Sequence, residues 1–280
     1  MNNKPKIITA FCLFVLALCS CSSTPLPREA SVAIPEDFFG MVHAGTKKNP
    51  KEYELINQME VKWLLNTFYW RRIEKEKDVF NFSQYDIFTE QAVKENKKIV
   101  AVLAYDTYWL YPDGKLKRKV TPENLPHFLH FVEEVVTHYR DTVDVWEIWN
   151  EPNIKFWKGS RKDFYELTRV TALKIREIHP EAYILGGVFW RAPGGFIKAM
   201  HKAGALEGLD GVAFHPYAFN PVGSMQVYDR FLKTLADINF TGPVWITEAG
   251  YPTDGWPLIK APLEEFPSYV IKTISGAAAR

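Results

Sequence analysis

The chain has 280 residues, of which 47% are hydrophobic and 24% are charged, and its net charge is +1. A chain of this length and composition can bury a substantial core, which excludes intrinsic disorder and predicts one large domain. The basic residues are scattered along the sequence, so electrostatics gives no case for a nucleic-acid partner or for polybasic binding to a membrane.

The first 21 residues have the pattern of a bacterial export signal. Lys4 and Lys6 give a positively charged start, and the apolar run over residues 7–18 that follows is too short to span a membrane. The sequence LCSC, residues 18–21, resembles the lipobox of bacterial lipoproteins, and this resemblance implies cleavage before Cys21 and lipidation of its side chain. An ordinary signal peptide that is cleaved at another position is the alternative.

The cysteines and the polar segment that follows agree with a lipid anchor. Cys12, Cys19 and Cys21 are the three cysteines of the chain, so none remains in the body for a disulfide or a thiolate metal site. Residues 22–36 are polar and contain prolines, which predicts a tether between the anchor and a domain at residues 37–280. Serines rather than an aspartate follow Cys21, which resembles the outer-membrane sorting pattern of lipoproteins. We therefore expect an exported protein that is lipid-anchored in the cell envelope at the outer membrane.

From residue 37 onward, apolar runs of strand length alternate with longer segments of helical period, as in repeated βα units with a parallel sheet. One amphipathic helix is expected to begin at Ser83, and another is expected over the helically spaced apolar residues between Phe128 and Tyr139. The seven expected strands are 38–43, 61–69, 98–105, 143–150, 182–189, 211–217 and 242–250.

Seven units of about thirty residues predict a (β/α)₈ TIM barrel rather than a doubly wound sheet, because no glycine-rich G-x-G-x-x-G turn follows an early strand. The segment Phe266–Arg280 predicts a helix, and no eighth strand is recognisable before the sequence ends. We therefore expect a catalytic barrel at residues 37–280 that lacks its eighth strand and helix. A truncated reading frame and a gap covered by another segment both stay open as explanations.

A row of polar side chains on the helix before the fourth strand raises the question of a metal site. His127, His130, Glu134 and His138 share one face of this helix. Rows of this kind are usually solvated surfaces, because metal-binding histidines sit in closed pockets with supporting hydrogen bonds. We expect no metal and no organic cofactor.

Two glutamates are expected at the carboxyl ends of strands. Glu151 follows the apolar run VDVWEIWN, and Glu248 lies in VWITEAGYP. Because active sites of barrels lie at the carboxyl ends of the strands, these two side chains can face each other across one cleft, as hydrolysis of a glycosidic bond requires. The alternative is that each glutamate merely begins a helix, since acidic residues favour helix N-termini.

These segments resemble the acid/base and nucleophile signatures of the clan A retaining glycoside hydrolases, which have (β/α)₈ barrels. The resemblance is greatest to the β-xylosidase and iduronidase family, glycoside hydrolase family 39, and it includes FFGMVH, WRRIEKEKDVFNFSQYD, WEIWNEPN, FHPYAFN and WITEAGYP. It implies an O-glycosyl hydrolase with a carbohydrate substrate from a plant or microbial polysaccharide or oligosaccharide, cleaved by double displacement.

The resemblance also implies roles for individual residues. Glu151 corresponds to the general acid/base and Glu248 to the nucleophile, while Asn150 corresponds to the residue that hydrogen-bonds the sugar 2-hydroxyl. His215 and Tyr217 match the pair that lines the floor near the nucleophile, where the Tyr217 phenol can donate to Glu248 and keep it ionised.

Further substrate contacts are expected from three other residues near strand ends. His43 ends the first predicted strand, and Trp109 and Trp157 follow the third and fourth. Aromatic rings stack on the apolar faces of sugars, so we interpret the two tryptophans as substrate platforms. Core packing is the alternative for each of them.

One departure from the clan's pattern bears on activity. Five residues before Trp70, where clan members carry an arginine that supports the nucleophile, this chain has Leu65. Lys62 or Arg71 could compensate for the missing charge. A carbohydrate-binding surface lipoprotein that has lost turnover is therefore the alternative function. The sequence predicts neither the sugar, nor exo or endo action, nor the oligomeric state.

Overall fold

A computed structural model of the chain describes residues 37–43 and 49–251, together with Ser268, Val270, Lys272–Ile274 and Ala277. These last residues are helical, and they fall within the helix expected at 266–280. The predicted export signal, the lipidation site Cys21 and the tether lie outside the described residues.

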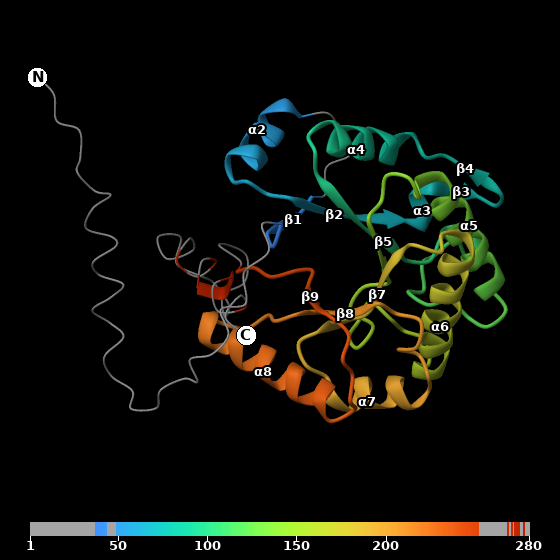
Figure 1. Cartoon of the computed structure of the whole chain (residues 1–280). Helices are drawn as coiled ribbons and strands as arrows, with labels where there is room; N and C mark the ends of the chain where they lie inside the picture. The colour runs from blue at the N-terminus through green and yellow to red at the C-terminus, as the bar shows by residue number, and fades with distance from the viewer. Residues whose placement is uncertain are drawn as a thin grey trace, which may run out of the picture. The chain divides into compact units, whose positions relative to one another are not determined.

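The described part of the chain is built around one parallel sheet of seven strands (Figure 1). The order in the sheet is β1-β2-β5-β6-β7-β8-β9, so the strands lie side by side in the order of the chain, and all six pairs are parallel. The strands are β1 (Gly40–Val42), β2 (Trp63–Tyr69), β5 (Lys98–Ala104), β6 (Val145–Ile148), β7 (Tyr183–Trp190), β8 (Gly211–His215) and β9 (Val244–Ile246).

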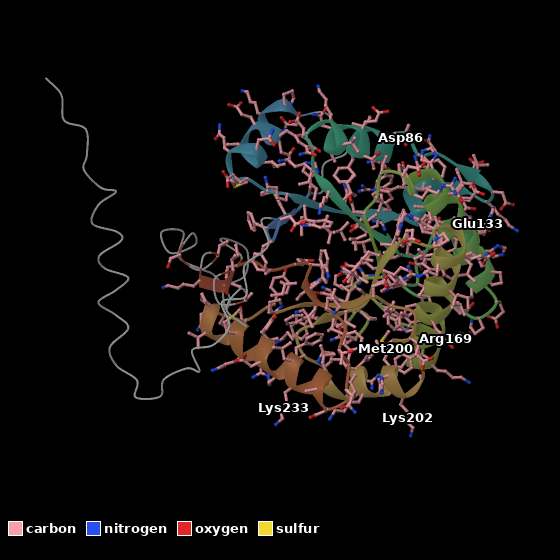
Figure 2. All side chains as sticks on the ribbon, viewed as in Figure 1. Asp86, Glu133, Arg169, Met200, Lys202 and Lys233 are labelled. Carbon is pink, nitrogen blue, oxygen red and sulfur yellow. The ribbon has the colours of Figure 1, made fainter. Side chains whose placement is uncertain are left out.

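Helices connect the strands and cover the outer face of the sheet (Figure 1). They are α2 (Pro50–Gln58), the one-turn α3 (Trp70–Ile73), α4 (Ser83–Lys94), the short 3₁₀ helix η1 (Tyr108–Leu110), α5 (Leu125–Tyr139), α6 (Arg161–Ile178), α7 (Gly194–Lys202) and α8 (Pro221–Ala236). A small antiparallel hairpin, β3 (Glu74–Glu76) with β4 (Val79–Phe80), follows α3. Exposed charges such as Glu133, Lys202 and Lys233 lie on the outer side of the helices (Figure 2).

The sheet curls into a barrel wall. Trp63 of β2 and Trp245 of β9 make an edge-to-face contact with their ring centroids 5.3 Å apart. In the order of the sheet these strands are five places apart, which in a flat sheet would separate them by about 24 Å. Their contact therefore requires strong curvature, and the described strands form seven strands of a (β/α)₈ barrel.

Side chains alternate between the two faces of this wall. Val100, Val145 and Leu185 form an inner cluster, against which Trp63 and Trp245 pack. The residues next to these in sequence, such as Ile99, Trp146 and Ile184, point to the other face and belong to the larger core that the strands share with the helices. This alternation decides which strand residues can reach the inside of the barrel.

The fold class, the seven expected strands and the helix beginning at Ser83 are confirmed, with strands shorter than predicted at several ends. The expected helix between Phe128 and Tyr139 is α5, with Phe128, Phe131, Val132 and Val135 buried. The hairpin β3–β4 was not predicted, because its few residues carry mixed charges and no alternating apolar pattern. Residues 252–267, which include the start of the helix expected at 266–280, lie outside the described part of the chain.

Candidate active site

Glu151 lies in a tight turn shortly after β6, which ends at Ile148. Its backbone φ is +45° and that of Trp149 is +64°, a left-handed conformation that costs an ordinary residue about 1 kcal/mol. The turn is held because the Glu151 N–H donates to the carbonyl of Val188 at 2.9 Å and the Trp149 N–H donates to that of Leu103 at 3.1 Å. The Glu151 side chain is buried, with 6% of the residue exposed.

The segment after Glu151 is fixed to the neighbouring strand. The side chain of Asn153 makes two hydrogen bonds to the backbone of Trp190 at the end of β7: its Nδ2 donates to the carbonyl and its Oδ1 accepts from the N–H, each at 2.9 Å. Two parallel bonds to one residue orient the loop strongly, so Asn153 holds the turn that carries Glu151.

Glu248 approaches from the other side of the opening, two residues after β9. The Tyr217 hydroxyl donates a hydrogen bond to Glu248 Oε1, as the sequence predicted. Burial, together with the negative charge of Glu248, raises the pKa of the Tyr217 phenol far above its ordinary value, so Tyr217 stays a neutral donor. The Glu248 side chain is 39% exposed and is therefore accessible from solvent.

His215, the last residue of β8, lies between the two carboxylates. Its Nδ1 is 2.7 Å from Glu151 Oε1 and 3.8 Å from Glu248 Oε2. These two carboxylate oxygens are therefore no more than about 6.5 Å apart, the sum of the two distances. On the other side of the ring, Nε2 is 3.3 Å from the Thr247 hydroxyl.

The carboxylates control the protonation of His215. Burial disfavours the charged imidazolium, but the hydrogen bond with Glu151 and the charges of Glu248, Glu147 and Glu151 outweigh it and raise the pKa of His215. An Nδ1–H of this ring can donate to Glu151 whether the ring is neutral or charged.

Several solved structures of glycoside hydrolases have a fold similar to that of this chain. A family 39 glycoside hydrolase from the gut symbiont Bacteroides cellulosilyticus WH2 superposes with a TM-score of 0.72 at 21% identity over 87% of this chain and 54% of that chain. A GH39 β-xylosidase from Caulobacter crescentus gives 0.67 at 18% identity over 85% and 58%. Xylanase 10B from Thermotoga petrophila RKU-1, in complex with xylobiose, gives 0.61 at 18% over 86% and 78%.

The fold is a (β/α)₈ barrel, as in these three structures. No protein-family profile matches the sequence, and a search of curated proteins found no match either. The chain spans little more than half the length of the two family 39 structures. At these identities the likeness shows the fold, and in this barrel fold the carboxyl ends of the strands are where active sites lie.

At that rim of the barrel, the structure brings together Glu151, Glu248, His215 and Tyr217, as predicted. It adds Asn150, whose Nδ2 donates to the hydroxyl of Tyr105 at 2.9 Å.

Tyr105 is a rim residue that the sequence did not single out. It follows β5, its ring packs edge-on against Trp149 and is stacked on Phe156 at 5.8 Å, and the charges of both glutamates act on its phenol. Burial is the largest cause that raises the pKa of Tyr105, so it too stays neutral. Its position after a strand was the available signal, because such positions lie at the rim.

Glu147 is a second residue that the sequence did not single out. It is an inner residue of β6, 1% exposed, in the strand that ends just before Glu151. Burial raises the pKa of Glu147 to about 7, against smaller opposing effects of His215 and of a hydrogen bond from Thr247. Period-two alternation from Val145 would have predicted that this carboxyl points into the barrel.

Trp157 is a correction to the sequence prediction. Only 6% of it is exposed, its ring packs edge-to-face against Trp149 and Phe164, and its indole N–H donates to the carbonyl of Ser160 at 2.9 Å. No ring face is free to stack on a sugar. Trp157 is a core residue of the loop between β6 and α6.

Trp109 likewise makes structural contacts. Its indole N–H donates to the carbonyl of Glu74 at 3.1 Å, and its ring packs against Trp70 and His127. These contacts fasten the loop after β5 to the β3–β4 hairpin and to α5. None of them involves the two glutamates or His215.

His43 is also separated from the candidate site. It is 2% exposed, its ring lies against Tyr53 of α2 and Phe88 of α4, and its Nε2 is 3.2 Å from Glu52 Oε1. These contacts place its side chain in the helical layer, so the structure does not bring His43 together with Glu151 and Glu248 as the sequence predicted.

The leucine at position 65 lies in the inner apolar cluster with Val100, Val145 and Leu185. Of the two cations that could replace an arginine there, Lys62 is exposed and precedes β2, at the amino end of the strand. Arg71 follows the carboxyl end of β2, and its guanidinium lies 4.1 Å from the ring centroid of Tyr69. The structure therefore places Arg71, and not Lys62, at the rim.

The polar row on α5 has separate partners. His130 lies 3.9 Å from Asp78, His138 bonds to Asp86 at 2.9 Å, and the ring of His127 packs on Trp109. Among the described residues, no group of three or more possible ligands could hold a metal ion.

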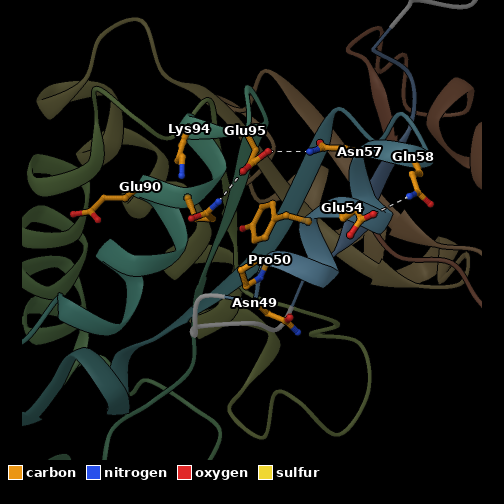
Figure 3. A pocket seen from close by; sticks show the side chains of 10 residues that line it. Asn49, Pro50, Glu54, Asn57, Gln58, Glu90, Lys94 and Glu95 are labelled. Carbon is orange, nitrogen blue, oxygen red and sulfur yellow. Dashed lines mark hydrogen bonds between the residues drawn. The ribbon is translucent and has the colours of Figure 1, made fainter.

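Two surface hollows lie in the described part of the chain. One, of about 780 Å³, lies between α2 and α4 and is lined by polar residues such as Glu54, Asn57 and Glu95, none of which is a predicted site residue (Figure 3). The other, of about 530 Å³, is lined by Arg191 and by residues of the loop and helix after β8. The Arg191 N–H donates to the His215 carbonyl at 2.9 Å, but Glu151, Glu248, His215 and Tyr217 are not among the residues that line this second hollow.

Proposed function

We propose that the protein is a retaining O-glycosyl hydrolase in which Glu151 is the acid/base and Glu248 the nucleophile. The observation that carries this proposal is the convergence of two glutamates from β6 and β9 on one histidine, with two of their oxygens no more than about 6.5 Å apart. Retaining enzymes have carboxyl groups about 5–5.5 Å apart, whereas inverting enzymes need about 6.5–9.5 Å to admit a water. An upper limit of this size is compatible with double displacement, which the product stereochemistry tests directly.

In the first step, a Glu248 oxygen attacks the anomeric carbon while the bond to the leaving oxygen breaks. Glu151 gives its proton to that oxygen, so the leaving sugar departs as a neutral alcohol. In the second step, Glu151 accepts a proton from water, the water oxygen attacks the anomeric carbon, and the bond to Glu248 breaks. Both glutamates return to their starting states, and two inversions give net retention.

The neighbours of the glutamates suit these roles. Tyr217 donates to Glu248 Oε1, which leaves Oε2 free to attack. His215 holds Glu151 Oε1, so Oε2 is the oxygen that would carry the proton toward the substrate. We assign Asn150 to the sugar 2-hydroxyl, where a hydrogen bond that strengthens in the transition state contributes to the rate.

A chemical-rescue experiment tests the assignment of the nucleophile. Glu248→Gly should abolish hydrolysis of activated aryl glycosides, and added azide should restore turnover and give a glycosyl azide of inverted configuration. Glu181→Gln, on an exposed glutamate beyond the end of α6, is the matched control and should keep the wild-type rate. Unchanged hydrolysis by Glu248→Gly would remove Glu248 from the mechanism.

The sugar is best sought first among xylosides, because the similar structures include a β-xylosidase and a xylanase bound to xylobiose. Proton NMR of the first-formed product gives the stereochemistry, and an initial product of opposite anomeric configuration would exclude retention. Glycan binding by the wild-type protein, with no hydrolysis of any aryl glycoside, would instead indicate a non-catalytic binding lipoprotein.

We further propose that the protein is exported and anchored by a lipid on Cys21 at the outer membrane. The support is the lipobox-like LCSC sequence behind a charged and apolar start. No helix of the described residues has the length and apolarity needed to cross a bilayer. Labelling with a palmitate analogue should mark the wild-type protein and not Cys21→Ala, and equal labelling of the two would contradict the anchor.

A further inference from the structure

Glu147 is a buried carboxyl that the proposed double displacement does not use. It lies in β6 at the level of Val102 in β5 and Leu185 in β7, its register partners, and both of these are apolar. Val145, two residues earlier, is an inner residue, so Glu147 points to the inside of the barrel, beneath the rim.

The polar groups around Glu147 come from β8 and from the end of β9. Thr247 hydrogen-bonds to the Glu147 carboxyl, and the charges of His215 and Glu248 act on it. Thr247 also lies 3.3 Å from His215 Nε2. Thr247 therefore connects Glu147 to the ring edge of His215 that faces away from Glu151.

Charge balance in this group decides the state of Glu147. Three carboxyls, Glu147, Glu151 and Glu248, act on the single imidazole of His215. Glu248 is 39% exposed and is screened by solvent, but Glu147 and Glu151 are both buried, and one imidazolium cannot neutralise a full charge on each of them. Glu147 is the most buried of the three, and its Oε2 has no hydrogen-bond partner. An orphaned oxygen is tolerable on a neutral acid and very costly on a carboxylate.

We propose that Glu147 is a positioning residue: a neutral carboxylic acid that, through Thr247, orients the His215 ring so that its Nδ1 faces Glu151. This assignment rests on the proposed function for its effect on the rate, but the protonation of Glu147 and the orientation of the ring do not depend on it. Because a neutral acid below the histidine carries no charge, the His215 ring can direct its hydrogen bond and its positive charge toward the two rim glutamates.

Four variants separate positioning from simple packing. Glu147→Gln keeps the shape and one acceptor for Thr247, whereas Glu147→Leu and Thr247→Val each break the connection. Val102→Ala removes volume at the same level of the barrel without touching the connection, and it is the control. Each variant is first checked for folding by circular dichroism and thermal unfolding.

We expect kcat on an aryl glycoside to fall by about 100-fold in Glu147→Leu and Thr247→Val with KM little changed, because the His215 ring loses its orientation. Glu147→Gln should restore most of this loss. Equal kcat in Glu147→Leu and Val102→Ala would overturn the proposal, and so would a Gln variant as slow as the Leu variant.

Two spectroscopic measurements stand independently of turnover. The infrared difference between wild type and Glu147→Gln at pH 6 should contain the carbonyl stretch of a protonated carboxyl. The ¹⁵N shifts of His215 should change in Glu147→Leu and not in Glu147→Gln. If the protein hydrolysed no glycoside but gave both the carboxyl band and the change in ¹⁵N shifts, the proposed hydrolase activity would be contradicted and the role of Glu147 would stand. Absence of the protonated carboxyl band would overturn the role of Glu147 whatever the activity.

Discussion

His215 Nδ1 and Glu151 Oε1 lie 2.7 Å apart although 64 residues separate them in the sequence. The contact is possible because β6 and β8 are both neighbours of β7 in a curled parallel sheet, so their carboxyl ends reach the same part of the rim. The histidine thus links the residue proposed as acid/base to the rest of the site.

Replacement of His215 should therefore affect stability in a pH-dependent way. A histidine whose pKa is raised on folding stabilises the fold fully below its unfolded pKa of about 6.5, and this contribution is lost as the pH rises through the folded pKa. His215→Gln should lower the free energy of unfolding more at pH 5.5 than at pH 9. Urea unfolding at both values measures this, and a larger loss at pH 9 would contradict the charged pairing.

Glu147→Gln should show the opposite dependence. The folded pKa of Glu147 is about 7, above its ordinary 4.5, so the folded state binds more protons than the unfolded state between these values and wild-type stability falls as the pH rises. The penalty reaches on the order of 3 kcal/mol above pH 7 and is absent below pH 4.5. The glutamine variant should therefore gain on wild type between pH 5 and pH 8 in urea unfolding. A constant difference across this range would show that Glu147 does not titrate there.

Tyr217→Phe should slow the proposed reaction without unfolding the protein. The variant removes the hydroxyl that donates to Glu248, and loss of such a donor costs roughly 10- to 100-fold in kcat, with a smaller change in KM. Tyr139→Phe is the matched control, since its hydroxyl donates to Asp86 in the helical layer at 2.8 Å. Steady-state kinetics should show a loss in the first variant only, and equal rates in both would argue against a role for Tyr217.

The sequence predicted the site correctly wherever the position of a residue along a strand decides whether its side chain lies at the rim of the barrel. Glu151, Glu248, His215 and Tyr217 were placed at one rim because each follows or ends an apolar run, and parallel strands end at the same edge. The inward direction of Glu147 was available from the same alternation.

The errors have a different origin. Trp157 and His43 also stand after strands, but whether a ring meets solvent or core depends on what packs over it. Trp149 and Phe164 cover Trp157, while Tyr53 and Phe88 cover His43. These neighbours are brought together by tertiary structure, which a single sequence pattern does not encode.

Trp157→Ala tests this reinterpretation directly. A buried tryptophan replaced by alanine leaves a cavity and should cost about 3–5 kcal/mol of unfolding free energy, while Trp157→Phe should cost less. In the folded phenylalanine variant, KM for oligosaccharides should stay near the wild-type value. A large rise in KM with unchanged stability would restore the substrate-platform interpretation.

Arg71 and Lys62 are two cations at opposite ends of β2, so their replacement tests which end of the strand supplies positive charge to the proposed nucleophile. Arg71 lies beyond the carboxyl end of β2 with its guanidinium over Tyr69, and the Tyr69 ring is 6.1 Å from that of Tyr105, which contacts Asn150. A positive charge at this rim favours the ionised nucleophile, and partial exposure keeps the effect small. Arg71→Gln should lower kcat/KM by roughly 3- to 10-fold, less at high salt, and Lys62→Gln should leave it unchanged. If the lysine variant were the slower of the two, the charge that supports the nucleophile would not come from the rim.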